Sequence, residues 1–271
     1  MGFLVRITKP LALLGDFAVA QVADLGNFAL FSAQMVRWVF TDFTRWRLLR
    51  PQLYEVGFRS LPVILFTGAF VGMVLALQSY FQFEAMGRAS WSGAVINLSV
   101  IKELGPVLAG VMLAGRVGGA LAAGLGTMKV TEQIDALRTL GADPINYLAT
   151  PRFFACLLLV PILTLYSDAI GVLGGYMMSV KYYGISDFFY WEQTRRYLAR
   201  WDIFVGVAKS FFFGGAIGLI CCYKGFQTEQ GAEGVGRATT RAFVTSFITI
   251  LVGNFFLSLF FNTLYSMLYT R

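Results

Sequence analysis

Five long apolar runs restrict what this chain can fold into. The clearest run, residues 61–83, has 23 residues and no charged side chain. A helix of that length crosses the hydrocarbon core of a bilayer at 1.5 Å per residue. Similar runs with few or no charges follow at 95–126, 153–180, 203–223 and 242–269. Backbone polar groups must be satisfied internally in lipid, so the runs predict an all-α integral membrane protein with five spans.

The composition agrees with a membrane protein and argues against other classes. Hydrophobic residues make up 57% of the chain and charged residues 14%, whereas a soluble domain usually has about a quarter charged residues. The net charge is +7, but the basic residues flank the apolar runs and form no stripe for nucleic acid. The chain contains no His, the usual general base and commonest metal ligand. We therefore predict no catalytic residue and no metal site.

The N-terminal region differs from the rest of the chain. We assign residues 1–50 to an interfacial region and residues 51–271 to the five-span domain. Polar side chains recur on one side of a helical wheel in the N-terminal region: Asp16, Asp24, Asn27, Gln34 and Arg37. This pattern favours a helix that lies in the membrane plane. An incomplete first span is the alternative.

Basic residues between the runs predict the topology. If the N-terminus is inside, the inner segments 1–60, 127–152 and 224–241 contain seven, three and three Lys or Arg residues, against six in the outer segments. The positive-inside rule then places the N-terminus in the cytoplasm and the C-terminus outside. The outer segment "QTRRYLAR" (193–200) is basic. It is either an interfacial helix or a docking surface for a partner or anionic headgroups.

Small residues in the second run recur every four positions. They form two adjacent ridges: Ala114, Gly118, Ala122 and Gly126 on one, and Gly115, Gly119 and Ala123 on the other. Such ridges let helices approach closely in lipid. We predict that Gly115, Gly118, Gly119 and Ala122 are helix-packing residues, either within the bundle or across a dimer.

Charged residues interrupt the apolar runs. Lys102, Glu103 and Arg116 lie in the second run, Asp168 in the third and Lys209 in the fourth. A charge at the centre of a span costs roughly 2.5–3.5 kcal/mol on insertion scales, so these groups face partners or polar cavities. Lys102 and Arg116 lie about 40° apart on an ideal wheel. Either Lys102 snorkels and Arg116 pairs with Asp168, or these groups line a cavity where a lipid headgroup binds.

A short amphipathic helix is predicted between the second and third runs. Its polar and apolar sides are formed by Glu132, Asp135 and Arg138 and by Ile134, Leu137 and Leu140, respectively. Gly141 is a natural helix stop. A short cytoplasmic helix between two spans is typical of the surface that a membrane protein offers to a cytosolic motor.

Four stretches together resemble the MlaE permease family, the membrane subunit of ABC systems that move phospholipids through MCE-domain proteins. They are "GMVLALQSY" (72–80), "KELGPVLAGVMLAGRVGGALAAGLGTMKVTEQIDAL" (102–137), "LGADPINYLATPRF" (140–153) and "GRATTRAFV" (236–244). The resemblance runs from about Leu53 to Thr263. It implies a homodimer in the bacterial inner membrane, with an in-plane elbow helix before the five spans. It also implies a cytosolic ABC ATPase, a periplasmic hexamer of an MCE-domain protein and a STAS-domain protein bound through the ATPase.

The resemblance also implies residue roles. Phospholipid would bind at the dimer interface, near the outer surface, against Leu75, Gln78, Lys102 and Glu103. The coupling helix to the ATPase would contain Glu132, Gln133, Asp135, Leu137 and Arg138. The chain has no GxxxxGK[ST] motif, so ATP and Mg²⁺ would be bound by the partner ATPase and no cofactor by this chain.

We therefore expect the permease subunit of an ATP-driven phospholipid transporter rather than an enzyme. It would move lipid between the inner membrane and a periplasmic MCE-protein channel and maintain the lipid asymmetry of the outer membrane. One alternative is a secondary transporter of lipid or a small molecule, although the internal repeats common in that class are not found. The other is a membrane anchor for an MCE ring that transports nothing.

Overall fold

The structure is a computed structural model, and it describes residues 19, 22–39, 46–88 and 91–269. The chain divides into two units, Met1–Thr44 and Arg45–Arg271. In the first unit, residues 22–39 are helical, while much of the predicted elbow region (1–18, 20–21 and 40–45) lies outside the described residues. The domain division at residue 50 and the in-plane orientation remain predictions.

The second unit contains five helical segments that are long and apolar enough to cross a membrane. They are Trp46–Ala85, Ser92–Val130, Ile145–Tyr182, Arg200–Phe226 and Gly231–Leu268. This confirms the all-α membrane fold, and each candidate segment contains one of the five apolar runs or nearly all of it. Every segment extends beyond the apolar run that predicted it, because the helices continue into polar residues at their ends.

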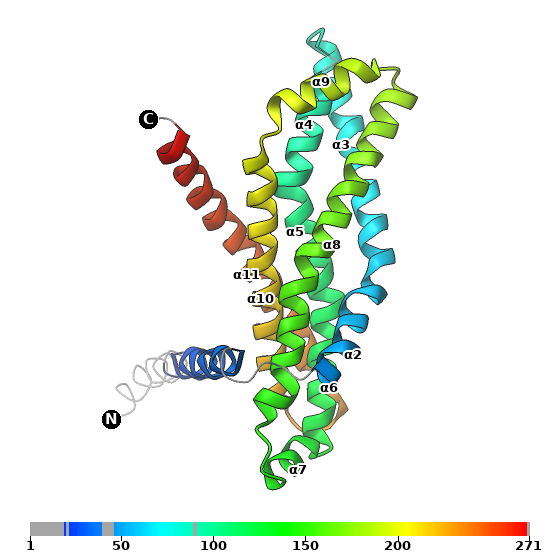
Figure 1. The fold of residues 1–271 in the computed structure, drawn as a ribbon. Coiled ribbons are helices and arrows are strands. Elements are labelled where there is room, and N and C mark those ends of the chain that lie inside the picture. The colour runs from blue at the N-terminus through cyan, green and yellow to red at the C-terminus, as the bar shows by residue number, and fades with distance from the viewer. Residues whose placement is uncertain (1–18, 20–21, 40–45, 89–90, 270–271) are drawn as a thin grey trace, which may run out of the picture. The chain divides into compact units, whose positions relative to one another are not determined.

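The spans are built from successive helical elements (Figure 1). The first contains α2 (Trp46–Val56), η1 (Phe58–Ser60) and α3 (Leu61–Ala85). The second contains α4 (Ser92–Ser99), η3 (Val100–Leu104), α5 (Gly105–Leu113), η4 (Ala114–Gly118) and α6 (Gly119–Val130). The third contains η5 (Ile145–Ala149), α8 (Thr150–Tyr176) and η6 (Met177–Tyr182). The fourth is α10 (Arg200–Phe226) and the fifth is α11 (Gly231–Tyr269).

Two short helices connect the spans. α7 (Gln133–Thr139) follows the second span and α9 (Asp187–Tyr197) follows the third. Figure 1 shows α9 crossing one end of the bundle, with α7 at the opposite end. Asn97 of α4 holds α9 in place, because it donates a hydrogen bond to Thr194 Oγ1 (2.9 Å) and accepts one from the Tyr190 hydroxyl (3.2 Å). The basic segment 193–200 thus includes the end of α9, and its interfacial or docking role remains a prediction.

α8 packs against both α3 and α10, and α10 packs against α6 and α11. Glycines allow the backbones of α3 and α8 to come into direct contact. A Cβ atom on Gly72 would lie 1.8 Å from the Gly171 carbonyl oxygen, and one on Gly174 would lie 2.5 Å from that of Ala69. Backbones in contact at these positions gain dispersion energy that larger side chains would prevent.

The predicted small-residue ridges of the second span lie against α10 and α11 of the same chain. A Cβ atom on Gly118 would meet Cys221 Sγ at 2.6 Å, and Cβ atoms on Gly115 and Gly119 would contact Phe243 and Thr239 at 3.4 and 3.5 Å. Ala122 is fully buried. These four residues therefore have packing partners within the bundle.

The second span departs from an ideal helix at η3 and η4, which are both π-helical. Each π-turn changes the direction of the side chains that follow it. The angle of about 40° between Lys102 and Arg116 holds for an ideal helix, and the second span is not one. Lys102 points to Asp202 of α10, whereas Arg116 points to Ser60 of η1.

We expect Gly72→Ala to destabilise the bundle, because its methyl group would overlap the Gly171 carbonyl and force α3 from α8. Overpacking of this kind costs about 1–3 kcal/mol in the free energy of unfolding. Thermal unfolding of the detergent-purified protein measures it. Gly124→Ala is the matched control, because nothing lies within 4 Å of a Cβ there. Equal melting temperatures for the two variants would contradict the close α3–α8 contact.

Candidate functional site

The candidate site forms around the π-turn η3, where a proline leaves a backbone carbonyl without its helical partner. Pro106 has no N–H group, so the carbonyl of Lys102 cannot accept the usual hydrogen bond from four residues ahead. The ammonium of Lys209, on α10, donates to this carbonyl instead, at 3.2 Å. The gap in the second span is thus filled by a cation from the fourth.

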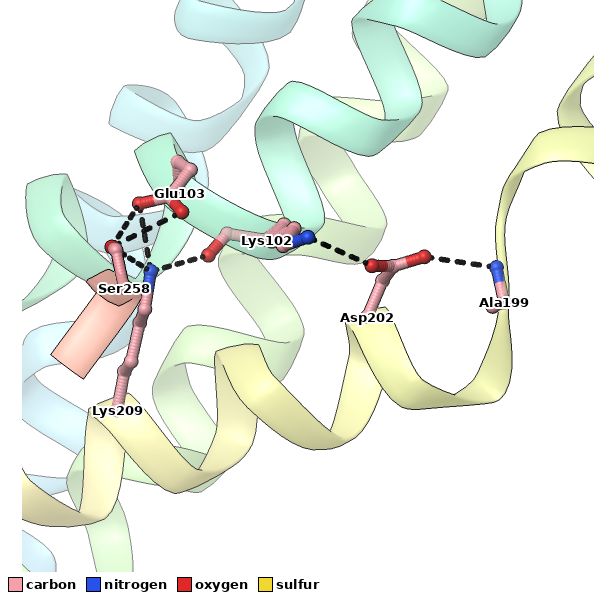
Figure 2. Close-up of polar contacts among 6 residues, drawn as sticks. All are labelled: Lys102, Glu103, Ala199, Asp202, Lys209 and Ser258. Carbon is pink, nitrogen blue, oxygen red and sulfur yellow. Dashed lines mark hydrogen bonds and ion pairs between the residues drawn. The ribbon is translucent and has the colours of Figure 1, made fainter. Parts of the chain in front are cut away.

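Lys209 is the most deeply buried charge of the site, with an exposed fraction of 0%. Its ammonium has three donors, and the structure gives it three acceptors. Besides the Lys102 carbonyl, they are Glu103 Oε2 at 2.7 Å and Ser258 Oγ at 2.8 Å (Figure 2). Burial of an ammonium is tolerated only with such compensation.

Glu103 connects the same cation to the fifth span. Its carboxylate accepts hydrogen bonds from Ser258 Oγ at 3.1–3.2 Å and from Asn254 Nδ2 at 3.3 Å, both on α11. The Glu103 side chain is 37% exposed, although Lys209 is not exposed at all. Of the two charges in this ion pair, only the Glu103 carboxylate is therefore accessible to a molecule outside the bundle.

Lys102 forms a second ion pair beside the first. Its Nζ lies 3.3 Å from Asp202 Oδ1, and the other carboxylate oxygen of Asp202 accepts a hydrogen bond from the Ala199 backbone N–H at 3.0 Å (Figure 2). Asp202 thus fixes both the start of α10 and the Lys102 ammonium. Lys102 does not simply snorkel toward water.

We call Lys102, Glu103, Asp202, Lys209, Asn254 and Ser258 the charged cluster. Two ammonium groups face two carboxylates, so its formal charge sums to zero. The cluster joins the second, fourth and fifth spans. Among the residues that the structure describes, no group of three or more His, Cys, Asp and Glu side chains is placed to hold a metal ion.

An aromatic surface lies next to the charged cluster. On α11, Phe255, Phe256 and Phe260 are largely exposed, and the C-terminal part of this helix leans away from the bundle (Figure 1). Trp201 at the start of α10 packs edge-on against Phe261, with ring centroids 6.4 Å apart. Paired charges beside exposed rings suit an amphiphile with a polar head and apolar chains.

The predicted lipid-binding residues fall into two groups. Lys102 and Glu103 belong to the charged cluster, where their contacts are with α10 and α11. Leu75 of α3 packs instead against Ile96 and Val100, and Gln78 is exposed on the same helix. The contacts within one chain do not bring the α3 pair to the charged cluster.

The proposed ion pair between Arg116 and Asp168 was wrong. Arg116 Nη1 donates to Ser60 Oγ at 2.5 Å and to the Glu55 carbonyl at 3.4 Å. Asp168 is buried on α8, next to Gly105, where a Cβ atom would lie 1.7 Å from its Oδ1. Gly105 and Arg116 are eleven positions apart, roughly 16 Å along a helix, so the two charges lie at different depths.

The predicted coupling residues lie on α7 or precede it. Glu132 adopts a left-handed conformation (φ 60°), and Gly141 ends the helical segment in the same region (φ 76°), as expected for a glycine stop. Ile134 anchors α7 with an exposed fraction of 1%, whereas Leu140 is 80% exposed. Gln133 is exposed and Leu137 is half-buried. An exposed ion pair joins Asp135 and Arg138 at 3.1 Å.

Sequence reasoning missed Asp202, Asn254 and Ser258. Asn254 and Ser258 are four residues apart in the apolar run 242–269, which contains no charge, so they share one face of α11. A polar pair of this spacing in an uncharged apolar run is a signal for a polar partner on a neighbouring helix. Asp202 carries a weaker signal, because an acidic residue in the first helical turn also has a capping role.

A double-mutant cycle should show that Glu103 and Lys209 act together. Glu103→Gln leaves a buried ammonium without its carboxylate, and we expect it to lower the free energy of unfolding by about 3 kcal/mol. Lys209→Met should cost less, because Glu103 is partly exposed. The double variant should be less destabilised than the sum, with a coupling of about 1–3 kcal/mol. Additive losses in chemical unfolding of the purified protein would contradict the ion pair.

Comparison with known proteins places the chain in a family. A family model described as Permease MlaE matches residues 49–260. A probable ABC transporter permease protein of Rickettsia typhi is 43% identical over 246 residues, which cover 91% of this chain and 95% of the relative. The chloroplastic protein TRIGALACTOSYLDIACYLGLYCEROL 1 of Arabidopsis thaliana is 41% identical, with 86% and 66% covered. The intermembrane phospholipid transport system permease protein MlaE of Haemophilus influenzae is 35% identical, with 78% and 81% covered. This multi-pass membrane chain belongs to the MlaE permease family.

Proposed function

We propose that this chain is the permease subunit of an ATP-driven phospholipid transporter in the bacterial inner membrane. It would exchange lipid with a periplasmic hexamer of an MCE-domain protein and so maintain the lipid asymmetry of the outer membrane. The charged cluster carries this proposal, because it places paired, partly exposed charges within membrane-spanning helices. The relatives named as ABC transporter permeases, and the Haemophilus protein named for phospholipid transport, support it.

The charged cluster suits a phospholipid headgroup by its chemistry. Lys102 offers an ammonium for the phosphate, and Glu103 offers a carboxylate for a headgroup amine. Both side chains are partly exposed, at 25% and 37%. Lys102 and Glu103 would keep Asp202 and Lys209 as partners while the headgroup binds their exposed sides, so no member of either ion pair is left unpaired. The exposed rings of α11 would then contact the acyl chains.

We propose that the site is completed in a homodimer. α3 exposes Phe66, Phe70 and Phe81, an apolar face that lipid or a second copy would cover. Leu75 and Gln78 lie on this helix, where Leu75 packs against Ile96 and Val100 of its own chain and Gln78 is exposed. α3 of a second copy would bring such residues to the cluster and enclose the lipid between two chains.

ATP-driven motion would enter through α7. Its exposed residues, with Leu140 beyond its end, form a surface that a cytosolic ABC ATPase could contact, and the buried Ile134 would transmit movement to the bundle. The ATPase would bind ATP and Mg²⁺ and carry the STAS-domain protein. This arrangement requires the N-terminus and α7 on the cytoplasmic side and the C-terminus in the periplasm, as the positive-inside bias predicts.

Glu132→Lys should uncouple the transporter. A reversed charge beside α7 should weaken the contact with the ATPase. We expect ATP-dependent lipid transfer to fall by about tenfold, the size of effect that the loss of a central interface contact has. The assay follows labelled phospholipid from vesicles that contain the permease and ATPase to the MCE-domain protein. Glu192→Lys, the same change on exposed α9 at the other end, is the control for ATPase binding.

The same assay separates the alternatives. Transfer that proceeds without the ATPase or ATP would identify a secondary transporter. An intact complex that retains the MCE ring but transfers no lipid under any condition would identify an anchor. Either result would overturn the proposed function.

A further inference from the structure

A second polar site lies at the α7 end of the bundle, away from the charged cluster. It is a half-open cavity of about 330 Å³. Its walls come from the end of α6, the end of α10, the connecting residues 227–230 and the first turns of α11. The cavity is lined by Lys129, Lys224, Thr228, Glu229, Arg237 and Arg241, among others.

The lining of this cavity is strongly basic. Lys129, Lys224, Arg237 and Arg241 contribute four cations from three different helices, whereas Glu229 is the one acidic side chain in the cavity lining. Lys129 Nζ donates to the Phe226 carbonyl at 3.0 Å, which fixes it at the cavity wall. Cations gathered from three helices repel one another, and an anion between them relieves this repulsion.

The contacts of Glu229 show how the cavity can hold an anionic group. Its Oε2 lies 2.6 Å from Arg237 Nη2 and its Oε1 lies 3.3 Å from Arg241 Nη1, so two guanidinium groups hold one carboxylate. The hydrogen bond from Arg237 lowers the pKa of Glu229, which keeps the carboxylate charged at neutral pH. Guanidinium groups bind phosphate oxygens in the same way.

The Glu229 side chain is also placed so that it can rotate out of the cavity into solvent. It lies in the short connection between α10 and α11, just before Gly231, whose φ of 84° marks a turn that favours glycine. About half of its side chain is exposed. A rotation of this side chain into solvent would free Arg241 and one nitrogen of Arg237, while Arg237 Nη1 kept its bond to Glu233 at 2.6 Å.

We propose that this cavity binds an anionic phosphate group, which replaces the carboxylate of Glu229 between Arg237 and Arg241. The predicted topology puts the cavity at the cytoplasmic surface. Basic pockets between transmembrane helices on that side are suited to anionic lipid headgroups. The phosphate belongs either to an anionic phospholipid of the inner leaflet or to free inorganic phosphate. The site is distinct from the proposed transport site, so it does not depend on the proposed function.

The test uses native mass spectrometry of the full chain in detergent, titrated with dioctanoyl phosphatidylglycerol and, separately, with inorganic phosphate. The double variant Arg237→Gln/Arg241→Gln loses two charged hydrogen bonds and should bind about tenfold more weakly. Glu229→Gln removes the competing carboxylate and should bind about two- to fivefold more tightly. Arg59→Gln is the matched control, because Arg59 is an exposed arginine paired with Glu55 at 2.9 Å and lies outside the cavity.

The affinities of the variants for the two probes test the proposal and identify the source of the phosphate. If only phosphatidylglycerol shows these opposite changes, the ligand is a lipid headgroup. If inorganic phosphate shows them too, the site takes free phosphate. The proposal is overturned if neither probe binds, or if binding is the same in all variants. The tighter binding of Glu229→Gln keeps the test decisive even if the double variant fails to fold.

Discussion

The buried ammonium of Lys209 joins the fourth span to the second and fifth spans. It contacts the second span through Glu103 and the Lys102 carbonyl, and the fifth span through Ser258. Every one of these partners is needed, because an unpaired charge in such a place is strongly destabilising. The interaction also explains why Pro106 is tolerated in a span, since the carbonyl that it leaves unpaired becomes a ligand for the cation.

The contacts of Lys209 require the second, fourth and fifth spans to lie at fixed distances from one another and to be rotated so that the paired side chains face each other. The glycine contacts between α3 and α8 set the backbone spacing on one side of the bundle, and those of the second span with α10 and α11 set it on the other. A Cβ atom on Gly206 of α10 would lie 2.3 Å from the Ile101 carbonyl oxygen. The fourth and second spans therefore touch one turn from Lys209, which lets its side chain reach the π-turn.

Hydrophobic run length was enough to predict the fold, but not the partners of the charges. The five spans follow from run length. The end of α7 follows from Gly141, a residue type that stops helices, so both predictions rest on local properties of the sequence. The partner of Arg116 depends on how the second span packs against η1, and nothing in "VIKEL" or "AGRVG" marks the two π-turns of that span. Asp202 and Ser258 were missed because they meet Lys102 and Glu103 only after distant spans pack.

The charged cluster and the basic cavity at the α7 end differ in net charge, so they suit different ligands. The charged cluster is neutral, so under the proposed function a zwitterionic headgroup would leave it without creating a large field within the membrane. The cavity at the α7 end has an excess of positive charge, which suits an anion that binds and stays. Only a position at the membrane surface tolerates that excess, because water and salt screen it there. The charge balance of the two sites thus fits the predicted topology, in which the basic cavity lies at the cytoplasmic surface and the neutral cluster lies within the spans.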